Sequence, residues 1–168
     1  MNKIAFITGA TSGIGRATAL KAAETGFDII ITGRRSDRLE ALAEEIRQKG
    51  VEALPLHFDV RKSVEVQAAI DNLSGKWRNI HVLVNNAGLA VGVNPIQEGI
   101  LEDWERMIDT NVKGLLYITR AIAPLMIANR CGHIVNLASI AGKEVYPGGN
   151  VYCATKHAVD ALSRAMIC

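Results

Sequence analysis

The sequence has no apolar run long enough to cross a membrane and no cysteine pattern typical of a metal site or a disulfide framework. Its 168 residues contain three cysteines, Cys131, Cys153 and Cys168, whose spacing matches neither zinc ligands nor paired bridges. The N-terminus has only Lys3 and a short apolar stretch, too brief for a signal peptide. We therefore expect reduced thiols, no metal and a cytoplasmic protein.

Charge imbalance, internal repeats and linkers are also missing from the sequence. Nineteen Lys and Arg residues against 17 Asp and Glu give a formal net charge of +2. This charge is too small to indicate a nucleic acid or a membrane surface as the partner. A length of 168 residues is enough for one domain with a proper core.

Short apolar runs alternate with segments of helical periodicity along the whole chain. The runs predict buried strands at residues 4–8, 27–32, 51–58, 80–84 and 133–138. Helical spacing predicts a helix after each of the first four strands, including one with Ser36 as its N-cap and a long one over 102–129, and a last helix from near Asn150. This order predicts an α/β fold: a doubly wound, Rossmann-like parallel sheet in a three-layer α/β/α arrangement, which binds ligands beyond the carboxyl ends of its strands.

A glycine-rich loop follows the first predicted strand. It reads Thr8-Gly9-Ala10-Thr11-Ser12-Gly13-Ile14-Gly15 and leads into a helix, whose free N–H groups and positive dipole end favour a phosphate. The spacing Gly-x-x-x-Gly-x-Gly differs from the usual dinucleotide fingerprint, so a plain strand-to-helix turn is the alternative.

The end of the second predicted strand indicates which nucleotide the loop would take. NAD-binding folds place an acidic residue there to bind the ribose 2′-hydroxyl. This sequence has Gly33-Arg34-Arg35 instead, and a guanidinium suits a 2′-phosphate. We therefore expect NADP, with Arg34 as the preferred ligand; Arg35 could be only part of a basic turn.

Residues 139–156 hold the candidate reactive groups. Tyr152 and Lys156 stand four apart, so on a helix their side chains are neighbours. A phenol has a pKa near ~10, and an adjacent ammonium stabilises the phenolate and lowers that pKa toward neutrality. Ser139, at a strand end, could hold a polarised oxygen. Taken alone, the spacing is also compatible with an ordinary helix.

Asn111 lies on the apolar stripe of the long predicted helix. A buried amide without partners costs on the order of 1–3 kcal/mol, so its side chain should satisfy a backbone bend or hold a water. A satisfied core asparagine is the alternative.

The sequence resembles the classical short-chain dehydrogenase/reductase family in the order and approximate spacing of its motifs, over essentially the whole chain. The motifs that carry the resemblance are Thr8 to Gly15, Asp59-Val60, Asn85-Asn86-Ala87-Gly88, Asn111, Ser139 and Tyr152-x-x-x-Lys156. The resemblance implies an oxidoreductase that transfers a hydride between NADP(H) and a carbonyl or secondary alcohol. It implies that Asp59 and Val60 lie at the adenine, and that Asn111, Ser139, Tyr152 and Lys156 form a catalytic tetrad. The implied cofactor-binding residues are Gly9, Thr11, Ser12, Gly13, Ile14, Gly15, Arg34, Arg35, Asp59, Val60, Asn86, Ala87, Gly88, Tyr152 and Lys156.

Several segments are similar to the branch of NADP-dependent 3-hydroxy acid dehydrogenases, which includes serine and allo-threonine dehydrogenases. They are residues 33–39, 86–90, 107–111 and 147–152. The branch implies a small 3-hydroxy acid or serine-like substrate. The alternatives are another branch such as 3-oxoacyl-carrier-protein reductase, a catalytically silent NADP-binding module, and an assembly fragment with exposed apolar faces.

Members of the family continue past the position of Cys168 with further strands and a segment that covers the substrate. We therefore expect residues 1–168 to be a single NADP-binding domain that is incomplete at its C-terminus. We expect a protein that ends there to be aggregated, partly unfolded or oligomeric, and inactive. The last helix carries small or apolar residues on two faces, which in this family implies a homo-oligomer, a dimer or tetramer. These residues are Ala154, Ala158, Ala161, Ala165, Val159 and Met166.

Overall fold

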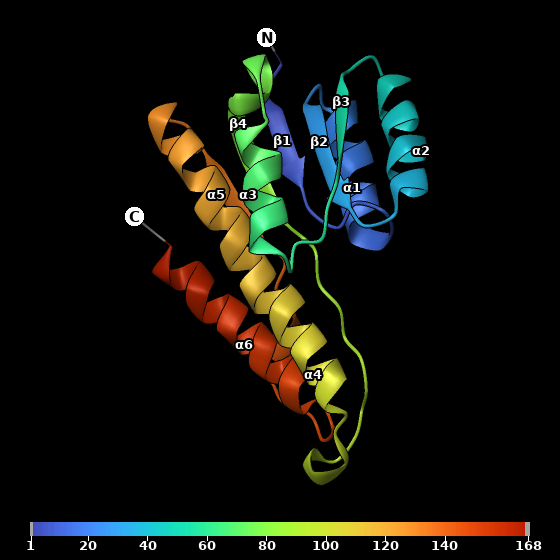
Figure 1. The fold of residues 1–168 in the computed structure, drawn as a ribbon, viewed down its shortest axis with the longest axis vertical. Helices are drawn as coiled ribbons and strands as arrows, with labels where there is room; N and C mark the ends of the chain where they lie inside the picture. The colour runs from blue at the N-terminus through green and yellow to red at the C-terminus, as the bar shows by residue number, and fades with distance from the viewer. Residues whose placement is uncertain (1, 167–168) are drawn as a thin grey trace.

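Five parallel strands form one sheet in the order β3-β2-β1-β4-β5 in the computed structural model, which describes residues 2–166 (Figure 1). Cys168 lies outside the described residues. The strands are β1 (Ile4–Ile7), β2 (Asp28–Gly33), β3 (Ala53–His57), β4 (Ile80–Asn85) and β5 (His133–Asn136). The chain runs outward from β1 to β3 and then returns to β4 beside β1. The predicted doubly wound sheet is thereby confirmed, with its reversal point between β1 and β4.

Helices cover both faces of the sheet because successive strand residues point to opposite sides. On one face, Ile7, Ile29 and Ile31 pack with α1 (Gly13–Glu24) and α2 (Ser36–Arg47). On the other face, Phe6, Ile30 and Leu83 pack with α3 (Ser63–Asp71) and α5 (Leu115–Ala128). The last helix, α6 (Asn150–Ala165), lies beside α4 (Leu101–Ile108) (Figure 1).

The long helix expected over 102–129 is interrupted. Between α4 and α5 lies a π-helical segment, Asp109–Gly114. Gly114 is needed there because an added Cβ would lie 2.9 Å from a methyl group of Val60. The bulge could not be predicted from the hydrophobic stripe, because apolar positions continue on both sides of it. π-bulges often occur at functional sites, and this one contains Asn111.

The start of α2 also differs from the expectation. Ser36 is the first residue of the helix rather than its N-cap, and Arg35 occupies the cap position in an extended conformation with no side-chain capping bond. The Arg35 side chain instead turns toward the end of β1, as described below.

Of the two apolar faces of α6, one is buried and the other is open. Cys153 and Val159 are buried, whereas Ala154, Ala161 and Ala165 are exposed. Among residues 2–166 no helix is both long enough and apolar enough to cross a lipid bilayer.

Candidate active site

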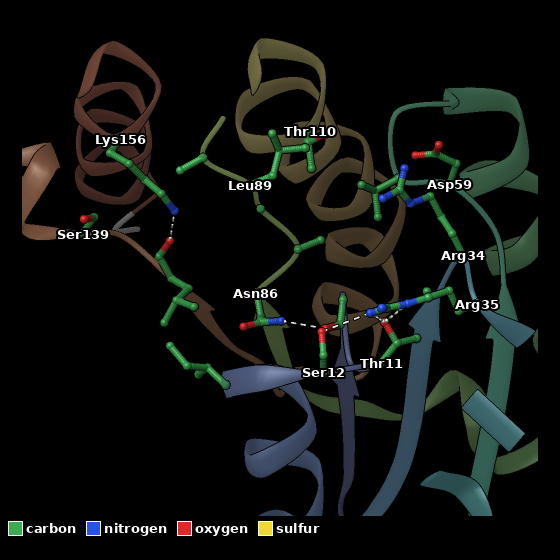
Figure 2. Close-up of a pocket in the computed structure, with 18 of the residues that line it drawn as sticks. Thr11, Ser12, Arg34, Arg35, Asp59, Asn86, Leu89, Thr110, Ser139 and Lys156 are labelled. Atoms are coloured by element: carbon green, nitrogen blue, oxygen red, sulfur yellow. Dashed lines mark hydrogen bonds between the residues drawn. The ribbon is translucent and has the colours of Figure 1, made fainter. Parts of the chain in front are cut away.

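A cleft of about 560 Å³ opens at the carboxyl ends of the strands (Figure 2). Most of the residues singled out in the sequence line it together. Those in its wall are Gly9, Thr11, Ser12, Ile14, Arg34, Arg35, Asp59, Val60, Asn86, Ala87, Gly88, Ser139, Tyr152 and Lys156. The wall does not include Gly13, Gly15 and Asn111.

Two glycines of the loop after β1 are required by its packing. Gly9 has a φ of +65°, a conformation that favours glycine. A Cβ on Gly15 would lie 2.3 Å from Nδ2 of Asn86 and 2.6 Å from the carbonyl oxygen of Gly9. Gly15 therefore lets α1 begin directly under the loop. The first turn of α1 contains no acidic residue, so its unpaired N–H groups keep a positive field.

Thr8 joins the glycine loop to the segment after β4. Its Oγ1 accepts hydrogen bonds from the backbone N–H groups of Asn86 and Ala87, each at 3.0 Å. In return, Nδ2 of Asn86 donates to the carbonyl oxygens of Thr8 at 2.8 Å and Gly9 at 3.1 Å. The amide of Asn86 thus holds the two sides of the cleft floor together.

The two arginines after β2 take different positions in the cleft. Nη2 of Arg35 donates to Oγ1 of Thr11 at 2.5 Å and to Oγ of Ser12 at 3.0 Å. Figure 2 shows Arg35 reaching across the glycine loop, while Arg34 extends toward Asp59. Arg35 is therefore part of the cleft wall as much as Arg34, which the sequence favoured.

The carboxyl group of Asp59 is ionised and lies at the far end of the cleft. Burial raises the pKa of its carboxyl, but hydrogen bonds and charge from Arg61, with the charge of Arg34, hold the pKa below its ordinary value. Arg61 and Asp59 form an ion pair at 2.6 Å. This pairing fixes the turn that follows β3, where Val60 is part of the cleft wall.

Tyr152 and Lys156 lie on one face of α6, as their spacing predicts. Nζ of Lys156 is 5.9 Å from the centre of the Tyr152 ring and donates to the carbonyl oxygen of Leu137 at 2.8 Å. Lys156 is only 7% exposed, and burial lowers the pKa of its ammonium group. A desolvated ammonium held near a phenol stabilises the phenolate more strongly than a solvated one.

Ser139 follows β5 and faces the same cleft. Its Oγ accepts a hydrogen bond from the backbone N–H of Ala141 at 3.2 Å, so its own proton is available to a ligand. The turn after it packs closely on α6, because a Cβ on Gly142 would lie 2.6 Å from the carbonyl oxygen of Lys156. Sequence reasoning missed Gly142, since this approach is between backbones and leaves no side-chain pattern.

Asn111 is 2% exposed and has every polar atom of its side chain paired. Its Oδ1 accepts from the N–H of Leu89 at 2.9 Å, and its Nδ2 donates to the carbonyl oxygen of Leu89 at 2.9 Å and to Oγ1 of Thr155 at 3.0 Å. These contacts describe a satisfied core asparagine, the alternative expected from the sequence, that also pairs the backbone groups of Leu89. Leu89 lines the cleft, whereas Asn111 and Thr155 lie behind it.

Comparison with known proteins settles the family. The family described as short chain dehydrogenase matches residues 3–168. The chain belongs to this family.

Relatives of this chain include enzymes of the branch that the sequence resembles. It is 48% identical over 160 residues to the NADP-dependent 3-hydroxy acid dehydrogenase YdfG of Salmonella typhi, covering 95% of this chain and 63% of that protein. It is 47% identical over 169 residues to sulfoacetaldehyde reductase 2 of Chromohalobacter salexigens, covering 100% of this chain and 67% of that protein. These matches confirm the family and the branch resemblance. The chain spans less than two thirds of the length of the Salmonella protein.

A solved structure matches the fold closely. The closed form of serine dehydrogenase complexed with NADP⁺ superposes with a TM-score of 0.92 at 43% identity, covering 97% of this chain and 64% of that one.

Proposed function

We propose that this chain forms the cofactor-binding and catalytic part of an NADP-dependent oxidoreductase that interconverts a carbonyl compound and an alcohol. The observation that carries this proposal is that Tyr152, Lys156 and Ser139 share one cleft with a glycine loop and two arginines. A tyrosine beside a buried lysine is suited to proton transfer at an oxygen atom. The glycine loop and the arginines are suited to a phosphorylated nucleotide.

The donor groups of the cleft fit NADP. The N–H groups of the first turn of α1, which has no acidic residue, would hold the diphosphate. Arg34 and Arg35 would bind the 2′-phosphate, since the end of β2 has no carboxylate for a ribose hydroxyl. Asp59 and Val60 would contact the adenine from the turn after β3.

The remaining chemistry falls to three side chains. When bound, NADP(H) would supply or accept the hydride. Tyr152 gives a proton to the substrate oxygen in reduction and takes it in oxidation, while Lys156 stabilises the phenolate. Ser139 donates its free hydroxyl proton to the same oxygen and orients it. For Asn111, a role in holding a relaying water stays a prediction from the family resemblance.

The names of the relatives support one class of substrate. In a 3-hydroxy acid and in serine, the carbon that bears the hydroxyl is one CH or CH₂ group away from the carboxylate. In sulfoacetaldehyde, the aldehyde carbon is likewise one CH₂ group away from the sulfonate. We therefore propose a small substrate whose reacting carbon lies at this distance from an anionic group.

The open alanine face of α6 supports a homo-oligomer, a dimer or tetramer, as a further part of the proposal. Ala154, Ala161 and Ala165 are exposed there, and small side chains let a second helix approach closely. The cytoplasmic location expected from the cysteine content also stays a proposal.

The proposed function is tested by turnover with NADPH or NADP⁺ over a panel of substrates. We expect activity with 3-hydroxypropionate, serine or sulfoacetaldehyde, and much less with 2-butanol, which has no anionic group. Faster turnover of a 3-oxoacyl thioester would favour the alternative branch. NADPH binding without turnover of any substrate would indicate a silent module, and no binding would indicate an assembly fragment.

The cofactor preference gives a separate prediction. NADPH should bind at least about ten times more tightly than NADH, a difference of roughly 1.4 kcal/mol, because two guanidinium groups in the cleft wall would bind the 2′-phosphate. Arg34→Ala and Arg35→Ala should each reduce this ratio in fluorescence titrations. Arg38→Ala, on the exposed side of α2 and outside the cleft wall, is the control and should keep it. Equal affinities of the unchanged protein for NADPH and NADH would contradict the assignment.

A further inference from the structure

Thr155 is a buried hydroxyl between two residues of the proposed proton-transfer machinery. It lies on α6, three residues after Tyr152 and one before Lys156, and is 3% exposed. Threonine is a weak helix former, and its side chain here lies outside the cleft wall. Neither helix formation nor contact with a ligand therefore accounts for a threonine at this position.

The hydroxyl of Thr155 donates one hydrogen bond and accepts another. Its Oγ1 donates its only proton to the carbonyl oxygen of Tyr152 at 2.8 Å, and it accepts a proton from Nδ2 of Asn111 at 3.0 Å. Asn111 can be oriented only this way, because its Oδ1 receives the N–H of Leu89. The hydroxyl therefore links the turn of α6 that holds Tyr152 to the π-helical segment that holds Asn111.

The link extends to the part of the cleft wall that follows β4. Asn111 binds both backbone polar groups of Leu89, which lines the cleft next to Gly88. A Cβ on Gly88 would lie 3.3 Å from Oδ1 of Asn111 and 3.7 Å from Nζ of Lys156. Leu89, Asn111 and Thr155 thus form one hydrogen-bonded chain from the wall after β4 to the carbonyl oxygen of Tyr152.

We infer that Thr155 is a positioning residue, whose hydroxyl sets Tyr152 and Lys156 at the correct distance from the wall formed by Leu89. This inference rests on the proposed function. Proton and hydride transfer both require placement within a fraction of an ångström, and a misplacement of about 1 Å costs on the order of 10²-fold in rate. Packing of α6 alone would fix this distance less firmly than the hydrogen bonds among Leu89, Asn111 and Thr155 do, because hydrogen bonds have defined lengths and directions.

The test compares two substitutions in the whole protein. Thr155→Val keeps the shape of the side chain and removes both hydrogen bonds, so we expect kcat to fall roughly ten- to hundredfold while KM for NADPH changes less than about threefold. Thr155→Ser keeps the hydroxyl and should restore kcat to within about threefold of the unchanged protein. Thr119→Val is the matched control, because Thr119 is also buried and its Oγ1 also accepts from an asparagine, Asn85, at 2.9 Å. This control lies outside the cleft and should keep kcat.

Hydrogen exchange gives a readout that needs no turnover. In Thr155→Val, the amide of Leu89 and those of the first turns of α6 should exchange faster, whereas in Thr155→Ser they should exchange as in the unchanged protein. The inference is overturned if Thr155→Val keeps its kcat, if Thr155→Ser loses as much as Thr155→Val, or if exchange at Leu89 does not change. An unchanged protein that turns over no substrate would contradict the proposed function, and the exchange experiment would still decide the role of Thr155.

Discussion

Tyr152→Phe is expected to lower kcat by about 10²- to 10⁴-fold, which is the usual contribution of a general acid or base. The substitution removes one hydroxyl and little contact area, so the Kd for NADPH should stay within about threefold. The size of the effect follows from the surroundings of the hydroxyl. Nζ of Lys156 lies 5.9 Å from the centre of the Tyr152 ring, and burial lowers the pKa of this ammonium group. Tyr152 and Ser139 are both part of the cleft wall.

Tyr117→Phe is the control for this substitution. Tyr117 lies on α5, packs against the core on the α3 and α5 side of the sheet, and is not in the cleft wall. Loss of its hydroxyl should leave kcat unchanged. Steady-state kinetics with the best substrate of the panel, together with NADPH titrations, measure both variants. Near-normal turnover by Tyr152→Phe would show that another group moves the proton.

The sheet could be predicted from the sequence because its strands are buried on both faces. Such strands appear in the sequence as uninterrupted apolar runs, for example Phe6 with Ile7, or Ile29 to Ile31. The helical segments between the runs indicate parallel strands joined by helical crossovers. The π-helical segment could not be predicted this way. Its position depends on contacts of Asn111 with Leu89 and Thr155, which are 22 and 44 residues away in sequence.

The cleft could be predicted to the extent that its residues follow strands. The carboxyl ends of parallel strands meet at one edge, so the glycine loop, Arg34, Asp59 and Ser139 had to lie near one another. Roles that depend on backbone contacts were missed. Thr8 pairs with N–H groups after β4, and Gly142 allows the turn after Ser139 to touch α6. Such roles have no periodicity or motif from which to read them.

Gly142→Ala is expected to reduce kcat by roughly 10²-fold, although Gly142 bears no reactive group. The added Cβ would lie 2.6 Å from the carbonyl oxygen of Lys156 and 3.0 Å from its carbonyl carbon, where ordinary contact begins at 3.4 Å. Neither atom can yield as a side chain would, since both belong to the backbone of α6. Relief therefore requires a shift of about 0.8 Å between α6 and the turn after Ser139.

This shift separates Ser139 from Tyr152 and Lys156, so the rate falls because the hydroxyl groups no longer converge on one substrate oxygen. Overpacking should also lower the free energy of unfolding by about 1–3 kcal/mol. Gly132→Ala is the matched control for overpacking: its Cβ would lie 2.7 Å from Cβ and Sδ of Met126, a similar overlap, and Gly132 is not in the cleft wall. Turnover and thermal unfolding of both variants separate the two effects, because the control can lose stability but should keep its kcat. A Gly142→Ala protein with unchanged kcat would mean that the contact between this turn and α6 does not set the distance from Ser139 to Tyr152.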